Sequence, residues 1–194
     1  MRRITGALLT PVLLAPVLLV ALLGAGCATS RTGTGAPAVQ PSSAGGDADL
    51  YLAVLRRYLG TPADNSFPDR FATAYVLDRA DPNAADPMRA QAPGAGAPIG
   101  AADQRRIVAG LRGVATVRFV GAPDDVLDRS AGCARVPDGG ILITLGTPVG
   151  GPDRVEVGVS GFVACLGATW LTYVVERRDG GWQVTGTTGS RAVA

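Results

Sequence analysis

One apolar run near the start of the chain limits which part of it can form a folded core. Residues 4–23 carry no charged side chain, and about 20 apolar residues are enough to cross a bilayer. Pro11 and Pro16 interrupt the run, and each proline costs a helix interior about 3 kcal/mol. The run therefore makes a poor permanent membrane helix, and the core has to come from the residues that follow it.

The flanks of this run give it a second meaning. Arg2 and Arg3 precede it, and the small residues 24–26 separate it from Cys27. This order resembles the signal sequence of bacterial lipoproteins, although Gly24 stands where that family usually carries leucine. The resemblance implies a signal peptide over 1–26 and a lipid on the thiol of Cys27. It predicts an extracytoplasmic protein anchored to the cell membrane or the outer membrane; an ordinary cleaved signal and a retained membrane helix are the alternatives.

Composition divides the remainder of the chain into two parts. Residues 28–46 are small and polar and contain Pro37 and Pro41, so they cannot bury a core. We therefore expect a flexible tether over 27–46. Residues 47–194, about 148 in number, have the length of one domain.

Missing residue types exclude whole classes of chemistry. The chain has no histidine, and every one of its 18 basic residues is arginine. Catalysis by Ser-His-Asp or Cys-His, imidazole metal sites and lysine Schiff bases are thereby excluded. Without Arg2 and Arg3 the basic residues equal the 16 acidic ones. A neutral mature chain predicts no nucleic-acid partner.

Two cysteines remain after Cys27, namely Cys133 and Cys165. Outside the cytoplasm such a pair predicts a disulfide, and two buried free thiols or a redox pair are the alternatives. A simple meander would place the two cysteines about 33 Å apart, whereas a disulfide requires Cα atoms within about 7 Å. Either the segment around Cys133 lies outside that meander, or a bulge at Gly161 bends the strand, or the bond does not exist.

Hydrophobic periodicity and turn signals predict an α+β fold, with two or three helices packed on a curved antiparallel sheet of about five or six strands. The helices are expected over 47–60 and 101–112, each followed by a glycine or ended by one. Residues 81–98 contain four prolines and are expected to be irregular. Strands are expected over these ranges, several of them separated by glycine-rich turns: 71–77, 114–120, 141–145, 154–165, 169–177 and 182–187.

The last hairpin carries a second resemblance. In the run 171–186 (LTYVVERRDGGWQVTG), Leu171, Tyr173 and Val175 share one face, and Trp182 and Val184 alternate along the partner strand. This run resembles the final hairpin of NTF2-like cone-shaped domains. The resemblance implies N-terminal helices packed into the concave face of a bent sheet, often around a pocket.

Few residues qualify as a site. Ser160 stands in a sequence one glycine short of a nucleophile elbow, but Phe162 interrupts it. Asp124, Asp125 and Asp128 form a cluster that lacks the alternation of a calcium loop, so we expect turn or capping roles. Glu156 and Glu176 are expected to be solvated strand residues. The aromatic residues Phe162, Trp170, Tyr173 and Trp182 are expected to pack in the core, with a ligand pocket as the alternative.

The sequence therefore predicts a lipid-anchored, non-catalytic binding or structural domain of the cell envelope, without cofactor or metal. Its expected partners are the membrane, through the lipid on Cys27, and an envelope protein or a small apolar ligand. The alternatives are a carrier or sensor with an NTF2-like pocket and, third, a hydrolase that works without histidine.

The lipid on Cys27 can be tested in growing cells. Labelled palmitate should be incorporated into the wild-type protein and not into a Cys27→Ala variant, because the thiol is the acceptor. Gel autoradiography of the two immunoprecipitated proteins measures this. Equal labelling of both, or labelling of neither, would contradict the prediction.

Overall fold

The computed structural model describes residues 47–67, 70–89 and 96–194. The signal segment 1–26, the tether 27–46 and Cys27 that the sequence predicts lie outside these ranges. No helix within them is long and apolar enough to cross a membrane.

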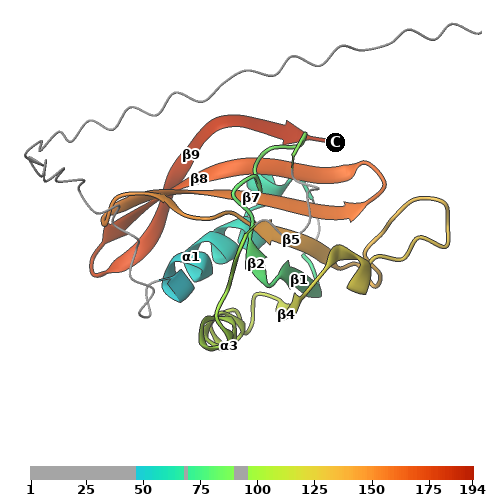
Figure 1. Ribbon diagram of the computed structural model, residues 1–194, viewed down its shortest axis with the longest axis horizontal. Helices are drawn as coiled ribbons and strands as arrows, with labels where there is room; N and C mark the ends of the chain where they lie inside the picture. The colour runs from blue at the N-terminus through green and yellow to red at the C-terminus, as the bar shows by residue number, and fades with distance from the viewer. Residues whose placement is uncertain (1–46, 68–69, 90–95) are drawn as a thin grey trace, which may run out of the picture. The chain divides into compact units, whose positions relative to one another are not determined.

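Three α-helices, one 3-10 turn and nine strands make up the described part (Figure 1). The helical elements are α1 (Asp47–Gly60), α2 (Pro62–Asn65), α3 (Ala101–Gly110) and the 3-10 turn η1 (Pro123–Asp125). The strands are β1 (Thr73–Leu77), β2 (Arg79–Ala80), β3 (Ala97–Pro98), β4 (Thr116–Val120), β5 (Ile141–Leu145), β6 (Val149–Gly150), β7 (Arg154–Ala164), β8 (Gly167–Arg178) and β9 (Gly181–Val193).

Helix α1 forms where the spacing of its apolar residues predicts it. Asp47 and Asp49 lie in its first turn, where carboxylates interact favourably with the helix dipole. Val54, Leu55 and Tyr58 recur at helical spacing and are fully buried. The short helix α2 was not expected; Pro62 begins it, a position where proline's missing N–H costs nothing.

The main sheet has seven strands in the order β4-β1-β5-β7-β8-β9, with β6 paired to β7. The α+β prediction is confirmed, but the antiparallel prediction is wrong for β1, which runs parallel to both β4 and β5. The reason is the connection. The chain crosses over from β1 to β4 through α3, and a helical crossover returns it in the same direction.

The sheet has an inner face, which α1 and α3 cover, and an opposite outer face (Figure 1). In β7 the alternation seen in the sequence is confirmed, because Val155, Val157 and Val159 point inward and are buried. Register shifts mark bulges after Phe162 in β7 and in β9 opposite Trp170 and Val174 of β8. Bulges increase the bend and twist of long strands, which is how β7–β9 curve around α1.

The outer face is also partly covered. Residues 81–89 form turns, and a side chain at Gly158 would meet the backbone of Ala85. Gly158 is therefore the position where this loop approaches the sheet closely. The expectation of irregular structure over 81–98 holds for 81–89, whereas β3 pairs with β2 in a short second sheet, and residues 90–95 lie outside the described ranges.

A disulfide joins Cys133 and Cys165, whose Cα atoms are 5.2 Å apart. The large separation that a simple meander would give the two cysteines does not arise. Residues 135 and 136 lie beside β7 on the same edge as β5 and do not form a separate strand. Arg135 forms a bridge with Ala164, and the backbone N–H of Cys165 donates to Ala134 at 2.8 Å. Cys133 is thereby brought next to the turn between β7 and β8.

This bond should stabilise the fold by constraining the unfolded chain. The cysteines are 32 residues apart, so their loss should lower the free energy of unfolding by about 3–4 kcal/mol in the chain-entropy model. Denaturant titration of a Cys133→Ala/Cys165→Ala variant measures this. Reductant should destabilise the wild type to the level of the variant and leave the variant unchanged; an equal effect of reductant on both proteins would contradict the assignment.

Candidate functional site

The four aromatic residues singled out in the sequence do not form one pocket. Tyr173 is fully buried on the inner face, and Trp182 packs partly buried against the same core. Phe162 and Trp170 have the opposite strand parity, so they lie on the outer face. The core role expected for these aromatics holds for Tyr173 and Trp182.

The inner face instead contains a polar contact at its centre. The hydroxyl of Tyr58, on α1, is hydrogen-bonded to Oγ1 of Thr169, on β8, and both residues are buried. A side chain at Gly161 would overlap the Tyr58 hydroxyl. Glycine at this position of β7 therefore makes the space in which α1 approaches the sheet.

A second polar contact lies beside the first. The hydroxyl of Tyr173 donates to Oδ2 of Asp64 at 3.0 Å, and Nε of Arg57 donates to the same oxygen at 2.6 Å. Helix α2 holds Asp64 in place, because the neighbouring Asn65 donates from its side chain to the carbonyl of Tyr58 at 2.7 Å. We call Arg57, Tyr58, Asp64, Thr169 and Tyr173 the inner cluster.

Burial sets the acidity of the tyrosines in this cluster. It raises the pKa of Tyr58 to about 12, and the hydrogen bond with Thr169 opposes that shift only in part. Burial also raises the pKa of Tyr173, and the negative charge of Asp64 adds to the effect. Both hydroxyls are therefore neutral hydrogen-bonding groups at physiological pH and are poor general bases.

Part of the inner cluster could have been predicted from strand alternation in the sequence. The alternation that places Leu171 and Tyr173 inward also places Thr169 inward, and a buried hydroxyl needs a partner. Asp64 and Arg57 had no such signal, because only the unexpected helix α2 brings Asp64 over the end of the sheet.

A surface hollow of about 470 Å³ lies between α1 and β9 and is lined by Leu52, Arg56 and Trp182, among others. Its charged side chains, Asp49, Arg56 and Arg57, are bonded within the fold. Arg56 donates to the carbonyl of Gly110 at 2.8 Å. The guanidinium of Arg177 stacks on the Trp182 ring at 4.5 Å, an arrangement that stabilises the hairpin. The hollow therefore presents no reactive group.

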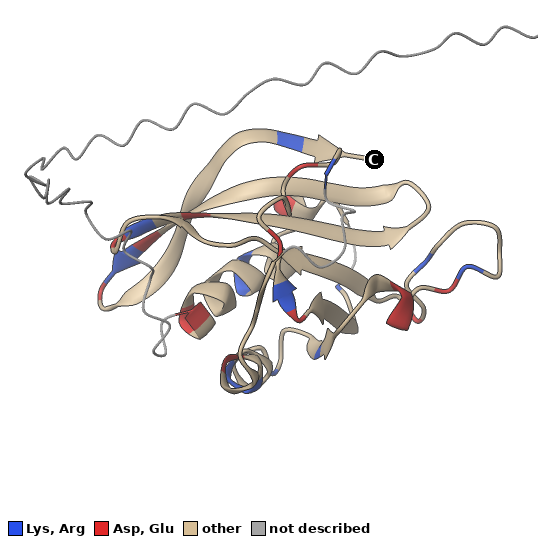
Figure 2. Cartoon of the chain, viewed as in Figure 1, with Lys and Arg blue, Asp and Glu red and all other residues tan. Residues whose placement is uncertain are grey.

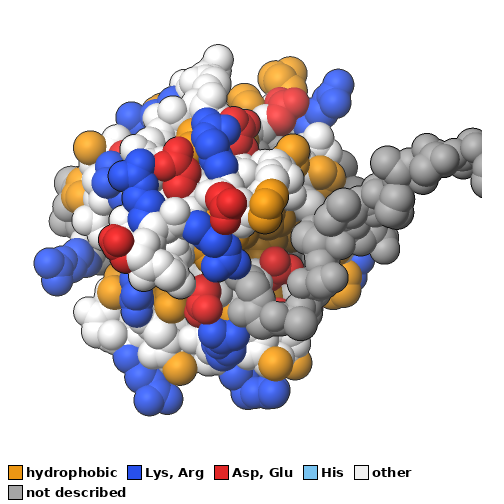
Figure 3. Space-filling view, turned by 90° about the vertical axis from the view of Figure 1, so that its left-hand side faces the viewer, with side chains coloured by type: hydrophobic (Ala, Val, Ile, Leu, Met, Phe, Trp, Pro, Cys, Tyr) orange, Lys and Arg blue, Asp and Glu red, His pale blue; other side chains and the backbone are white. Residues whose placement is uncertain are grey.

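The two glutamates come together on the outer face of β7 and β8, at the end of the sheet shown in Figure 2 by neighbouring red and blue positions. Arg154 lies 3.6 Å from a carboxylate oxygen of each, and Arg178 is 2.8 Å from Glu176. Figure 3 views the molecule from this end and shows acidic and basic side chains interspersed. Paired in this way, the glutamates form a surface ion-pair network and not a desolvated acid–base pair.

The remaining candidates have structural roles. Ser160 is buried on the outer face between Thr144 and Trp170. Asp125 accepts a hydrogen bond from the N–H of Ala122, as expected for a capping residue. Hydrogen bonds from Ser130 and Arg135 hold the pKa of Asp128 well below its usual value. Over the described ranges, no group of three or more His, Cys, Asp or Glu residues is placed to hold a metal ion.

No family model matches the chain, and no curated protein or solved structure is similar to it at a significant level. The likeness to NTF2-like domains therefore rests on the residues of the last hairpin alone.

The space at Gly161 can be tested by filling it. Gly161→Ala should lower the free energy of unfolding by about 2–4 kcal/mol, because overpacking and loss of the Tyr58–Thr169 hydrogen bond add. Gly186→Ala is the matched control on β9, where an added methyl group meets nothing within 4 Å. Chemical denaturation of both variants measures the difference; equal stabilities would contradict the close approach of α1.

Proposed function

We propose that the chain is a bacterial lipoprotein whose described part acts without catalysis, either by binding another envelope component or as a structural element. In this proposal the lipid on Cys27 holds the protein at the membrane. The observation that carries the non-catalytic part is that α1 fills the inner face of the sheet. In a cone-shaped fold the concave face is where a pocket would lie.

Both the apolar and the polar groups between α1 and the inner face of the sheet are closely packed. Tyr58, Leu171 and Tyr173 are at most 1% exposed. Within the described ranges every buried side-chain nitrogen or oxygen has a hydrogen-bond partner. A catalytic or ligand site usually leaves such groups free for its substrate. The inner cluster supports the attachment of α1 and offers nothing to a ligand.

The alternatives draw less support. A carrier of a small apolar ligand needs an enclosed apolar cavity, and the side chains of α1 occupy the place where the resemblance implies one. A hydrolase without histidine needs carboxylates of opposed acidity in one cleft, whereas Glu156 and Glu176 share the arginine between them. Surface binding or a structural role remains the function that the geometry supports best.

Native and denaturing mass spectrometry of the protein purified from its own host tests the proposal. We expect the same mass in both conditions, equal to the processed chain plus a covalent lipid, because nothing is bound in the interior. A Cys27→Ala protein is the control and should lack the lipid mass. A small molecule present only under native conditions would contradict the filled interior, and a turnover activity abolished by one surface substitution would contradict the absence of catalysis.

A further inference from the structure

The described arginines differ in whether a partner within the fold binds them. Arg57, Arg106, Arg129 and Arg135 each form an ion pair with an aspartate, and Arg154 and Arg178 pair with glutamates. In contrast, five exposed arginines have no hydrogen-bond or ion-pair partner among the described residues, namely Arg70, Arg79, Arg105, Arg112 and Arg118. The positive charge of these five is therefore not neutralised locally.

Three of these arginines, Arg70, Arg105 and Arg112, border one region of the surface. A hollow of about 470 Å³ is lined by Phe71, Val108, Arg112 and residues 113–117. Arg70 precedes Phe71. Arg118 alternates with the inward Val117 and therefore faces the outer side of the sheet, away from this hollow. Arg105 lies three residues before Val108 on α3, and Arg112 follows in the turn after the helix ends at Gly110. We call Arg70, Arg105, Arg112 and the hollow that they border the arginine surface.

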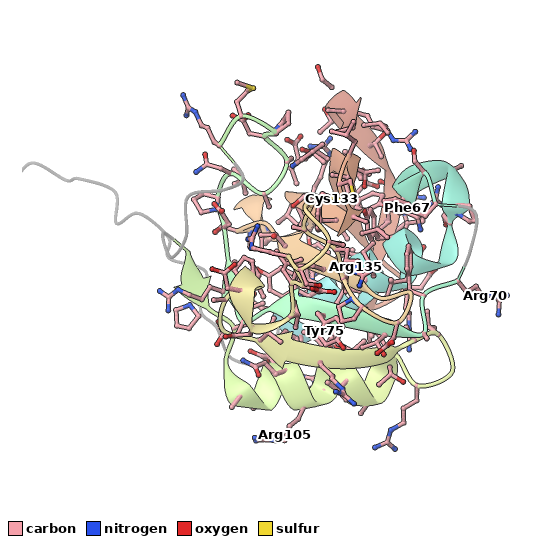
Figure 4. The ribbon with its side chains drawn as sticks, turned by 90° about the vertical axis from the view of Figure 1, so that its right-hand side faces the viewer. Phe67, Arg70, Tyr75, Arg105, Cys133 and Arg135 are labelled. Carbon is pink, nitrogen blue, oxygen red and sulfur yellow. A yellow bond between two sulfur atoms is a disulfide. The ribbon has the colours of Figure 1, made fainter. Side chains whose placement is uncertain are left out.

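Side chains of the arginine surface extend into solvent. Figure 4 shows Arg105 projecting outward from α3 and Arg70 projecting from the segment before β1. Between the helix and β4 the chain turns at Gly113, whose φ of +87° suits glycine. The turn leaves Val114 exposed at 38%. No acidic residue lines the hollow.

We propose that the arginine surface docks on the anionic phospholipid headgroups of the membrane that carries the lipid anchor. The inference rests on the proposed function in one respect, namely the anchor on Cys27. Charge complementarity indicates the occupant: three unneutralised guanidinium groups around an exposed apolar residue match phosphate groups above an acyl layer.

Because the lipid anchor already holds the protein at the membrane, a weak contact between the arginine surface and the bilayer is enough for docking. Residues 27–46 span at most about 70 Å when fully extended, so a lipid on Cys27 keeps the fold close to the bilayer and raises its effective concentration there. Each arginine near an anionic surface strengthens binding about fivefold. Docking of this kind is reversible and is weakened by salt.

Hydrogen exchange of the lipidated protein in vesicles tests the proposal. The protein purified from its host is reconstituted in phosphatidylcholine alone or in a mixture with phosphatidylglycerol. Amides of residues 111–119 should exchange at least roughly tenfold more slowly in the anionic vesicles, because β4 is an edge strand of the sheet and docking covers it. High salt should abolish the difference.

Matched variants distinguish an effect of the arginine surface from an effect of the protein's net charge. Arg105→Gln/Arg112→Gln should weaken docking about 25-fold and remove the protection. The Arg89→Gln/Arg129→Gln variant makes the same change of charge at two exposed, ion-paired arginines. It should keep the protection of residues 111–119. Equal exchange in the two kinds of vesicle, or protection that survives in the Arg105/Arg112 variant, would overturn the proposal.

The outcomes also separate this inference from the proposed function. A protein that fails to stay on phosphatidylcholine vesicles lacks the anchor, and the proposed function then fails. An anchored protein with no protection in anionic vesicles refutes the docking alone. Protection in isolated host membranes without protection in anionic vesicles would indicate an acidic protein partner instead and would overturn the assignment to phospholipid.

Discussion

The attachment of α1 to the inner face of the sheet is the contact on which the described structure depends. Tyr58 reaches over Gly161 to Thr169, and Tyr51 on the same helix donates to the carbonyl of Gly146 at 3.2 Å. The two bonds join helix α1 to residues 95 and 111 positions further along the chain. A hydrogen bond inside an apolar core is costly to leave unmade, so these two contacts fix the position of α1 as well as stabilise it.

Closure of the inner face determines where function can lie. The aromatic and polar residues that would line a cone-shaped pocket hold α1 in place, and arginines pair with both glutamates. What remains available is the outer surface, and there the distribution of unpaired charge is uneven. The chain as a whole carries little net charge, yet three of the arginines without partners, Arg70, Arg105 and Arg112, lie around the hollow between α3 and β4. The uneven distribution arises because some arginines have acidic partners nearby and others do not, which the amino-acid composition alone does not show.

Much of the fold could be predicted because it follows from local patterns. The apolar stripe of α1, the alternation of β7 and the Asp-Gly-Gly turn before β9 each predict the element that the structure contains. The parallel pairing of β1 could not be predicted, because strand direction depends on how a long connection crosses the sheet and not on the strand's own residues. The disulfide was expected from cysteine count, but the way Cys133 reaches Cys165 depended on residues 135 and 136 extending the line of β5.

The sequence was less informative about the candidate site. Thr169 could have been identified from the strand parity that it shares with Tyr173. The role of Asp64 could not, since α2 is one turn long and owes its position to contacts with α1. The aromatic residues were correctly assigned to packing in the case of Tyr173 and Trp182, but the sequence alone did not separate them from Phe162 and Trp170 on the other face.

Titration of the buried tyrosines tests most directly whether the inner face is closed to water. In a Tyr75→Phe variant only Tyr51, Tyr58 and Tyr173 remain, and burial raises the pKa of all three. Because the unfolded chain ionises near pH 10, the stability that these groups contribute is present below that pH and is lost as the pH rises toward 12 and above. Tyrosinate absorbance should therefore rise only together with the loss of circular dichroism. Ionisation of any of the three near pH 10 while the fold persists would show that water reaches the inner face and would contradict this account.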